Sequence, residues 1–427
     1  MEKSTSKQST TFLERAGIAL ADLGSIWGYE LRQSFRDVGM LIFFLIVPLI
    51  YPLLYSYIYS REVVREVPIA VVDHAATTQS REYLRRVQAT PEVSIVASCA
   101  NMEEAKEYVR TRRAYGIVYM PRDFSECLMR GEQSHVSVYS DMSSLLYYKS
   151  ILLANTQVSL EMNKDIKLER SPGLTVEQGE VLSYPLAYEE VPLYNPSTGF
   201  ASFLLPAVLI LIIQQTLLLG IGLSAGTARE QNSLGRLIPV GNRHYTGTLR
   251  IVLGKALAYV LIYILVVLYT LVFVPALFDF VQLADLGDLL LFVLPYVLAC
   301  VFFAMTLSVF VRHREACMLV FVFTSVPLLF LSGVSWPGAS LPEQWRWVSY
   351  LAPSTFGING YIKLNSMGAK LEDIRMEYLA LWGQVLCYFV STCIVYYVQL
   401  HRSPADGECD KSTVKGASQG SGSIAEQ

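Results

Sequence analysis

Long apolar runs restrict the fold of this chain more than any other feature. A helix needs roughly 20 mostly apolar residues to cross the hydrocarbon core of a bilayer. Runs that approach or exceed this length lie at residues 39–59, 199–225, 252–277, 289–310, 316–331 and 378–398. Only 17% of the 427 residues are charged, whereas soluble domains contain about a quarter. We therefore predict a polytopic α-helical membrane protein with six transmembrane helices.

Basic residues in the short loops predict the orientation of these helices, because cytoplasmic loops carry an excess of lysine and arginine. Such residues lie between the second and third runs and between the fourth and fifth: Arg229, Arg236, Arg243, Arg250, Arg312 and Arg314. The loop at residues 278–288 has three aspartates and no basic residue. We expect both termini in the cytoplasm and the protein in the inner, or plasma, membrane.

The loop between the last two runs departs from this charge rule. Its basic residues are Arg346, Lys363, Lys370 and Arg375. It also has aromatic residues of the kind that settles at the membrane interface, namely Trp336, Trp345, Trp347 and Tyr350. We expect a re-entrant or surface-lying hairpin at residues 332–362.

The runs divide the chain into five parts. Residues 1–37 are expected to be a cytoplasmic N-terminus and residues 38–60 the first transmembrane helix. Residues 61–198 form an inserted extracytoplasmic domain, and residues 199–400 a core with five further transmembrane helices. Residues 401–427 are polar and rich in glycine and serine, which predicts a disordered cytoplasmic tail.

The N-terminal part has the pattern of an amphipathic helix. Apolar residues recur at helical spacing, namely Leu13, Ala16, Leu20, Leu23, Trp27 and Leu31. Polar residues lie away from this stripe, namely Asp22, Ser25, Arg32 and Arg36. The pattern predicts a helix on the inner leaflet that leads into the first span. A helix packed on another cytoplasmic loop is the alternative.

The inserted segment alternates between strand and helix patterns. Strands are predicted at residues 67–73, 93–97, 115–120 and 135–141, and helices at residues 78–87, 102–111 and 143–168. This alternation indicates a small α/β domain with a mainly parallel sheet. Asp73 and His74 follow the first strand, but a solvated turn needs the same residue types, so no site is assigned to them. Cys99 and Cys127 can form a disulfide or remain free thiols.

No residue pattern indicates catalysis, metal binding or nucleic-acid binding. The five histidines are scattered and the net charge is -3, which gives no basic surface for nucleic acid. Gly254 and Lys255 come nearest to a phosphate-binding loop, but Leu249 stands where its first glycine belongs and Ala256 where its serine or threonine belongs. We expect no catalytic residue, metal or cofactor on this chain.

The predicted spans have almost no titratable group that would couple transport to protons. Their interior polar residues are Gln214, Gln215 and Gln384, which suit hydrogen bonds between helices. Lys255 lies about one turn inside the third run, from which its side chain can extend to the interface. Prolines occur in each of the first five spans, as in kinked or movable helices, namely Pro48, Pro52, Pro206, Pro275, Pro295 and Pro327. A pump without its own energy source needs a partner protein that supplies the energy.

Several segments also follow one another in a distinctive order. They are YELRQSFRDVGMLIFFLIVPLIYPLL, VPIAVVDHAATTQSREYLRRV, YGIVYMPRDFSECLMRGE, YNPSTGFASFLLP, AREQNSLGRLIPV, LGKALAY and LSGVSWPGASLPEQWRWVSYLAPSTFGINGY. Taken together, they resemble the permease subunits of type-2 ABC transporters, in the long subfamily that carries an external domain after the first span. The resemblance covers the whole chain, and it depends on the order of the segments.

The resemblance implies two permeases, as a homodimer or heterodimer, docked on two ABC ATPase subunits that hold ATP and Mg. The cytoplasmic hairpin of the family couples the permease to the ATPase, and its counterparts here are Arg229, Glu230, Gln231, Asn232, Leu234, Gly235 and Arg236. Alternatively, these arginines only keep the loop on the cytoplasmic side of the membrane. The hairpin between the last two spans of the family has its counterparts at Trp336, Pro337, Pro342, Pro353 and Gly360. Members with an external domain often work with a periplasmic adaptor and an outer-membrane duct.

The expected function is ATP-driven export, of the multidrug efflux kind, of a hydrophobic or amphipathic small molecule. The alternative is a membrane-anchored receptor or sensor whose external domain binds a ligand. One span would be enough to anchor such a receptor, and six spans with prolines favour transport.

Overall fold

The computed structural model describes residues 12–60, 62–170, 177–178, 181, 191–196, 198–231, 247–311 and 313–402. The chain divides into two compact units. The helical unit consists of Met1–Ser60 and Phe200–Gln427, and the α/β unit of Arg61–Gly199. Residues 403–427 of the predicted tail and part of the predicted coupling hairpin, Asn232, Leu234, Gly235 and Arg236, lie outside the described residues, whereas residues 401 and 402 of that tail end α16.

Five stretches of the described chain are long and apolar enough to cross a membrane. They are Val38–Tyr59, Phe200–Glu230, Thr248–Leu277, Leu286–Phe310 and Arg375–Gln399. The other predicted span falls in α13 (Arg314–Leu331), whose 18 residues give a helix about 27 Å long. This is shorter than the hydrocarbon core of about 30 Å, so a total of six spans stays a prediction.

Two of the long stretches contain a π-helical turn just before a proline. The first stretch consists of α2 (Val38–Leu41), a π-helical turn (Ile42–Ile46) and α3 (Val47–Tyr59). The third consists of α10 (Thr248–Leu268), a π-helical turn (Tyr269–Phe273) and α11 (Val274–Leu277). Pro48 and Pro275 each crowd the carbonyl four residues earlier, and the wider turn accommodates this crowding.

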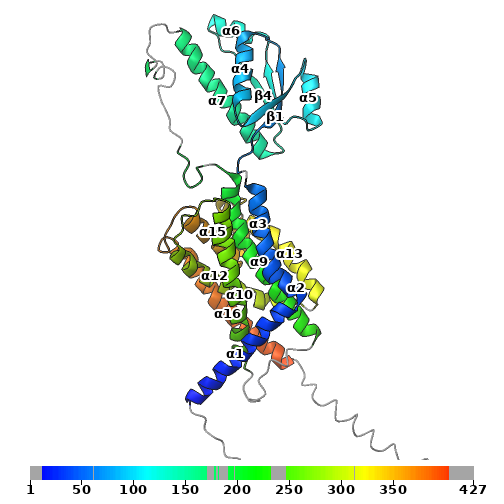
Figure 1. Ribbon diagram of the computed structural model, residues 1–427, viewed down its shortest axis with the longest axis vertical. Coiled ribbons are helices and arrows are strands. Elements are labelled where there is room, and N and C mark those ends of the chain that lie inside the picture. Colours follow the sequence, from blue (N-terminus) through cyan, green and yellow to red (C-terminus); the bar gives the residue numbers. More distant parts are fainter. Residues whose placement is uncertain are drawn as a thin grey trace, which may run out of the picture. The chain divides into compact units, whose positions relative to one another are not determined.

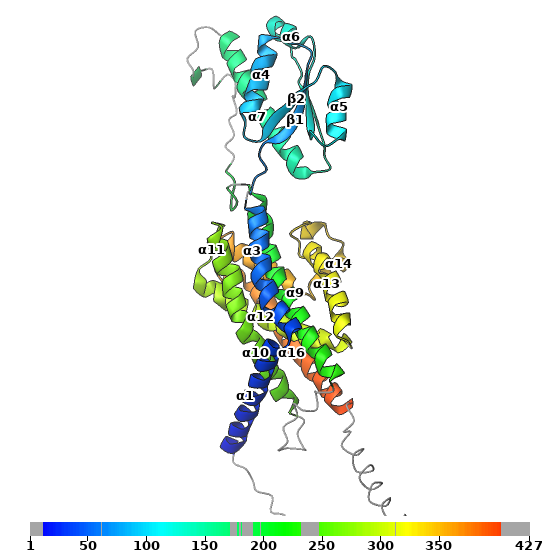
Figure 2. The ribbon, with the colours of Figure 1, turned by 45° about the vertical axis from the view of Figure 1, so that its right-hand side comes forward.

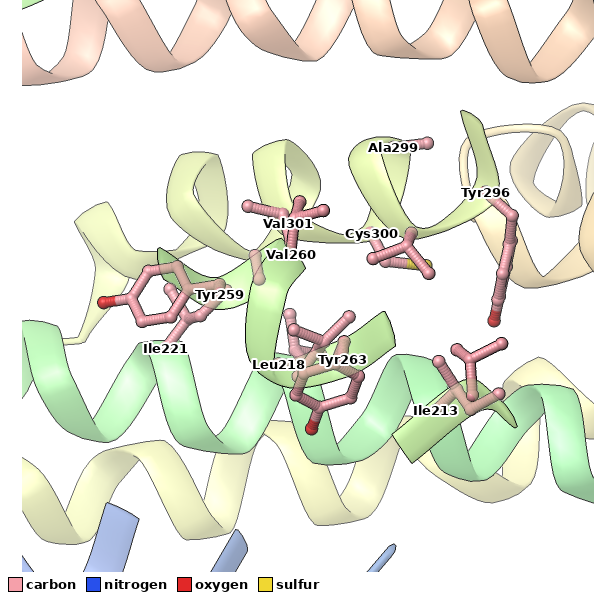
Figure 3. Close-up of a cluster of buried hydrophobic side chains, with 14 of the residues drawn as sticks. Ile213, Leu218, Ile221, Tyr259, Val260, Tyr263, Tyr296, Ala299, Cys300 and Val301 are labelled. Carbon is pink, nitrogen blue, oxygen red and sulfur yellow. The ribbon is translucent and has the colours of Figure 1, made fainter. Parts of the chain in front are cut away.

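The other helices of this unit are α1 (Phe12–Arg36), α9 (Phe200–Glu230), α12 (Leu286–Leu307), α14 (Glu343–Ser349), α15 (Pro353–Asn365) and α16 (Arg375–Arg402). The helix α9 forms the centre, and α3, α12, α13 and α15 pack around it (Figures 1 and 2). Figure 3 shows side chains of α9, α10 and α12 meeting in the core, including Ile213, Tyr263 and Tyr296.

Two of the three span amides bond to another helix, as predicted. The Gln214 Oε1 atom accepts a hydrogen bond from the backbone N–H of Ser354 at 2.7 Å, and Gln384 Nε2 donates to the Tyr350 carbonyl at 2.8 Å. For Gln215 the prediction is wrong within the described chain, because both its amide atoms are buried there without a partner.

The helix α15 lies inside the bundle, against α9 and α12. Gly357 and Gly360 make this packing possible. A Cβ atom at residue 357 would lie 2.4 Å from the Tyr296 ring, and one at residue 360 would lie 2.3 Å from the Phe292 ring. The hairpin at residues 332–362 therefore re-enters the bundle, whereas its depth in a membrane stays a prediction.

The α/β unit contains a four-stranded sheet in the order β2-β1-β3-β4. Its strands are β1 (Val67–Asp73), β2 (Val93–Ser98), β3 (Gly116–Met120) and β4 (Ser137–Ser140). The strand β1 pairs in parallel with β2 and β3, and β4 is antiparallel to β3. The predicted strands are confirmed, and the sheet is mixed because of β4. The side of a membrane on which this unit lies stays a prediction.

Helices cover both faces of this sheet. Figures 1 and 2 show α5 (Met102–Arg110) on one face and α4 (Thr78–Ala89) and α7 (Leu145–Arg170) on the other, with α6 (Phe124–Arg130) beside α4. The Asp73 carboxylate accepts hydrogen bonds from the turn that follows β1 and from Ser80, as expected of a turn residue. Cys99 and Cys127 are free thiols.

The close packing of α15 predicts that Gly360→Ala destabilises the protein, whereas Gly383→Ala does not. The first change forces a methyl group into the Phe292 ring, and overpacking of this kind costs about 1–3 kcal/mol. Gly383 lies in α16 with no atom within 4 Å of an added Cβ, so alanine is expected to be neutral or stabilising. Thermal unfolding of the detergent-solubilised variants tests this. Equal midpoints for the two variants would contradict the packing described.

Candidate coupling site

The helix α1 is attached to the bundle by ion pairs from three acidic residues. Asp22 binds Arg250 at 2.6 Å, Glu30 binds Lys255 at 2.9 Å, and Asp37 binds Arg314 at 2.5 Å. The first two basic residues belong to α10 and the third begins α13. The ion pairs therefore connect α1 and its C-terminal end to two different helices of the bundle.

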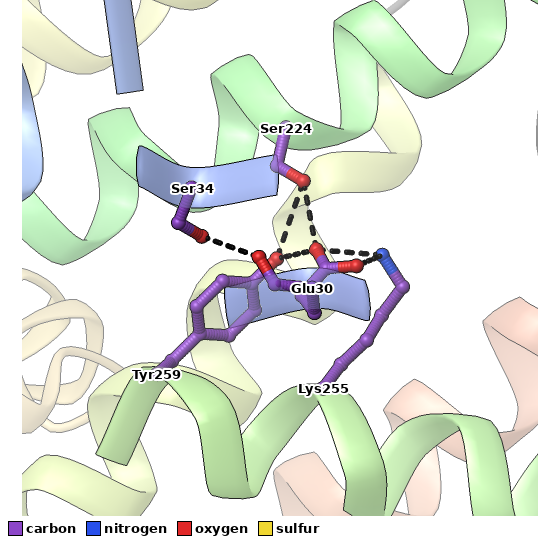
Figure 4. Close-up of polar contacts among 5 residues, drawn as sticks. All are labelled: Glu30, Ser34, Ser224, Lys255 and Tyr259. Atoms are coloured by element: carbon purple, nitrogen blue, oxygen red, sulfur yellow. Dashed lines mark hydrogen bonds and ion pairs between the residues drawn. The ribbon is translucent and has the colours of Figure 1, made fainter. Parts of the chain in front are cut away.

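The central pair is buried. Glu30 is 1% exposed and Lys255 is 3% exposed. The ammonium of Lys255 donates to both carboxylate oxygens of Glu30 at 2.9 Å, and the Tyr259 hydroxyl donates to Oε1. Ser224 of α9 donates to the same oxygen at 3.0 Å (Figure 4). Two helices, α9 and α10, thus supply all the partners that this carboxylate has in the described chain.

The surroundings of Glu30 determine its protonation. Burial alone would raise the pKa of the carboxyl, but the Lys255 ammonium and the hydrogen bonds from Tyr259, Lys255 and Ser224 outweigh this effect. The pKa of Glu30 therefore lies below its ordinary value, so the carboxylate stays ionised and the ion pair stays charged at neutral pH.

Gly254 allows α1 to approach α10 at this point. A Cβ atom there would lie 2.9 Å from the Cγ2 atom of Ile26. The glycine-lysine pair that resembles part of a phosphate loop thus has a packing role. Gly254 provides close contact with α1, and Lys255 binds Glu30.

The connection between α1 and α2 is fixed by Asp37. Its Oδ1 atom accepts hydrogen bonds from the backbone N–H groups of Gly39 at 2.9 Å and Met40 at 3.2 Å, which caps α2. The same atom binds the guanidinium of Arg314. A side chain at residue 39 would collide with this guanidinium, because an added Cβ would lie 2.7 Å from it.

Two residues of the predicted coupling hairpin lie at the end of α9, beside the segment that joins α12 to α13. Arg229 donates hydrogen bonds to the carbonyls of Val309 and Val311. Glu230 accepts a hydrogen bond from the backbone N–H of Arg314 at 2.9 Å, where an acidic group stabilises the start of a helix. Both residues thus connect α9 to residues 309–314. The N–H of Gln231 bonds to the Thr227 carbonyl in the last turn of α9.

One prediction about this region needs correction. Lys255 does not extend to an interface, because it is buried against Glu30. In the predicted apolar stripe of α1, Leu20 is 70% exposed, and Leu23, Trp27 and Leu31 are partly buried. The buried face of α1 instead contains Ile26, Glu30 and Ser34, since the charge on Glu30 needs partners that only the bundle provides. This face packs on α10. That the helix lies on the inner leaflet stays a prediction.

The other predicted site residues lie in the hairpin between α13 and α16. Trp336 is 56% exposed, and Pro337 and Pro342 precede short helical segments. Pro353 begins α15, and Gly360 packs on Phe292. Only the last two are buried.

The comparisons with known proteins agree with this architecture. Residues 38–394 match the family described as ABC-2 family transporter protein. The chain belongs to this family. It is therefore a permease component of the ABC transporter class, as its segments suggested, and a multi-pass membrane protein.

A relative of this ABC-2 family permease is ABC transporter G family member 20 of Dictyostelium discoideum. The two are 24% identical over 281 residues, which are 65% of this chain and 37% of the relative. The permease thus spans little more than a third of the length of the curated relative it matches.

The buried pair of the permease predicts a non-additive result for two substitutions. Glu30→Gln alone and Lys255→Met alone each leave one buried charge without its counter-charge, which typically costs about 3–5 kcal/mol. The double variant removes both charges and is expected to recover most of this loss. Thermal unfolding of the four proteins measures the coupling. As a control, Asp22→Asn breaks the more exposed pair with Arg250 and is expected to cost no more than about 1 kcal/mol.

If the double variant is as unstable as the sum of the two single variants, the pair does not hold α1 in place.

Proposed function

We propose that this permease is the membrane subunit of an ATP-driven exporter that moves a hydrophobic or amphipathic small molecule out of the cytoplasm or the inner membrane. ATP and Mg are bound by a separate ABC ATPase, and a second permease, identical or different, completes the membrane channel. The membership in the ABC-2 family supports this proposal. In this arrangement both termini face the cytoplasm, and the α/β unit faces the outside, where an adaptor and an outer-membrane duct could dock.

The contacts at the C-terminal end of α9 give the proposal its main support. Arg229 and Glu230 bind the segment at residues 309–314, and Asp37 binds Arg314 in the same segment. A force on the hairpin that follows α9 would therefore reach α9, α13 and α1 together. Such a connection is what a permease needs if a partner that hydrolyses ATP is to move its helices.

The mechanism follows from these contacts. Closure of the ATPase subunits presses on the hairpin, and α1 moves with α10 because of the Glu30–Lys255 pair. The prolines in the spans allow these helices to bend. The mostly apolar spans favour a substrate that is itself apolar or amphipathic.

Substitutions in the part of the hairpin beyond α9 separate docking from folding. Leu234→Asp combined with Arg236→Glu changes predicted docking residues and leaves Arg229 and Glu230 themselves unaltered. We expect the variant to unfold at the temperature of the wild type but to lose the co-purifying ATPase and its stimulated ATP hydrolysis. Lys370→Glu, an exposed charge change in the loop between α15 and α16, serves as the control and is expected to retain both.

Gentle extraction from the native membrane, followed by mass spectrometry and an ATPase assay, measures this. If no nucleotide-binding partner accompanies the wild-type protein, the exporter proposal fails and a receptor becomes the function to pursue. If the ATPase accompanies the hairpin variant as well as the wild type, the hairpin is not the docking element.

A further inference from the structure

The α/β unit contains an open cavity on the α4 side of its sheet. Its volume is about 290 Å³, roughly twice that of the ~150 Å³ engineered cavity that holds benzene in another protein. The helices α4, α6 and α7 and the strand β4 surround it, and Figure 1 shows these three helices near one another. A ligand of about two small rings would fill it.

One face of α7 forms much of the cavity wall. Leu152, Thr156, Ser159 and Asn163 recur three or four residues apart along this helix, the spacing that places side chains on one face. The adjoining face of α7, with Ile151, is buried in the core of the unit. Within the described chain the first face is therefore open, although it contains the apolar Leu152.

The chemistry of the wall is apolar with neutral polar groups. Phe124, Leu128, Val136 and Val138 are among its apolar residues, and none of the residues that line the cavity is charged. Burial raises the pKa of Tyr83 to about 12, so its hydroxyl stays neutral and donates to Asn155. A charged ligand would find no counter-charge in this wall, and transfer of an unpaired charge to such a site is costly.

One polar atom of the wall has no partner. The Ser134 hydroxyl oxygen is buried and makes no hydrogen bond within the described chain. Most buried polar atoms in native proteins are hydrogen-bonded, so each exception needs an explanation. A hydroxyl, ether or carbonyl group of a ligand in the cavity would supply the missing bond.

The helices around the cavity are held together without a ligand. Arg86 of α4 binds Asp165 of α7 at 2.6 Å, and Tyr83 bonds to Asn155 across the same pair of helices. The cavity is therefore a preformed feature, as small-molecule sites usually are.

We propose that the α/β unit binds a small, uncharged amphiphile, with an aromatic or branched apolar body and one hydrogen-bonding group, in the cavity between α4, α6, α7 and β4. The apolar residues hold the body, and Ser134 binds the polar group. This proposal does not depend on the direction or the energy source of transport.

The test uses the full chain in phosphatidylcholine nanodiscs and a neutral photoreactive probe, 4-(trifluoromethyl-diazirinyl)benzyl alcohol. After irradiation, peptide mass spectrometry locates the label. We expect saturable labelling of α6, β4 or the cavity face of α7. The corresponding benzoic acid, which is charged at neutral pH, is expected to label these segments about tenfold less at equal concentration.

Matched variants show whether the label depends on the cavity. Thr156→Phe fills the cavity and is expected to remove saturable labelling, whereas Gln157→Phe, at the next and exposed residue outside the wall, is expected to retain it. Ser134→Ala is expected to raise the half-saturating probe concentration about three- to tenfold, the contribution of one hydrogen bond. Ser140→Ala removes another buried hydroxyl without a partner that lies outside the wall, and it is expected to change nothing.

Ser134→Ala also keeps the test valid if Thr156→Phe fails to fold, because removing a buried hydroxyl without a partner does not destabilise the fold. The proposal is overturned if labelling of these segments does not saturate, if the charged probe labels them equally, or if Ser134→Ala and Ser140→Ala behave alike.

Discussion

The arrangement of the helical unit depends on one buried carboxylate. Removing an ion from water costs several kcal/mol even after the protein relaxes, and neither Glu30 nor Lys255 has appreciable exposure. The cost is offset because three side chains from α9 and α10 bind the carboxylate. The Lys255 ammonium reaches both carboxylate oxygens, and Tyr259 and Ser224 bind one of them. These bonds fix both the rotation of α1 about its axis and its position along α10.

The same end of the bundle is connected in a second way. The N-terminus of α13 is held by Asp37 through the Arg314 side chain and by Glu230 through the Arg314 backbone. One residue thus joins the end of α1 to the end of α9, although these residues are far apart in sequence. Gly39 lies against the Arg314 side chain and Gly226 against the Arg314 backbone, so the two glycines allow α2 and α9 to approach this residue closely. The ends of α1, α9 and α13 are thus joined, and none of the three can be displaced from the others without breaking one of these contacts.

The sequence predicts what depends on local periodicity and fails where distant residues meet. The strands of the α/β unit are predicted because VPIAVVD and YGIVYM have the composition of buried strands within a few residues. The long apolar helices are predicted for a similar reason. The buried role of Glu30 is not predicted, because its sequence context is that of a charged residue on a surface helix. Its partners are also distant in sequence, since Ser224 is 194 residues away. The one available signal was Lys255, a basic residue inside an apolar run, since such a residue requires an acidic partner somewhere in the chain.

The role of α15 also follows from polar groups that must find partners. The first N–H groups of a helix have no acceptor within it, and at a helix end buried in a bundle they are costly to leave unpaired. Proline at the first position of α15 removes one such donor, because Pro353 has no N–H. Gln214 accepts the next one from Ser354. The Gln214 amide in the middle of α9 and Pro353 at the start of α15 thus both reduce the number of unpaired N–H groups at this helix end. Gly357 and Gly360 allow α15 to pack closely enough for the Gln214 hydrogen bond to form.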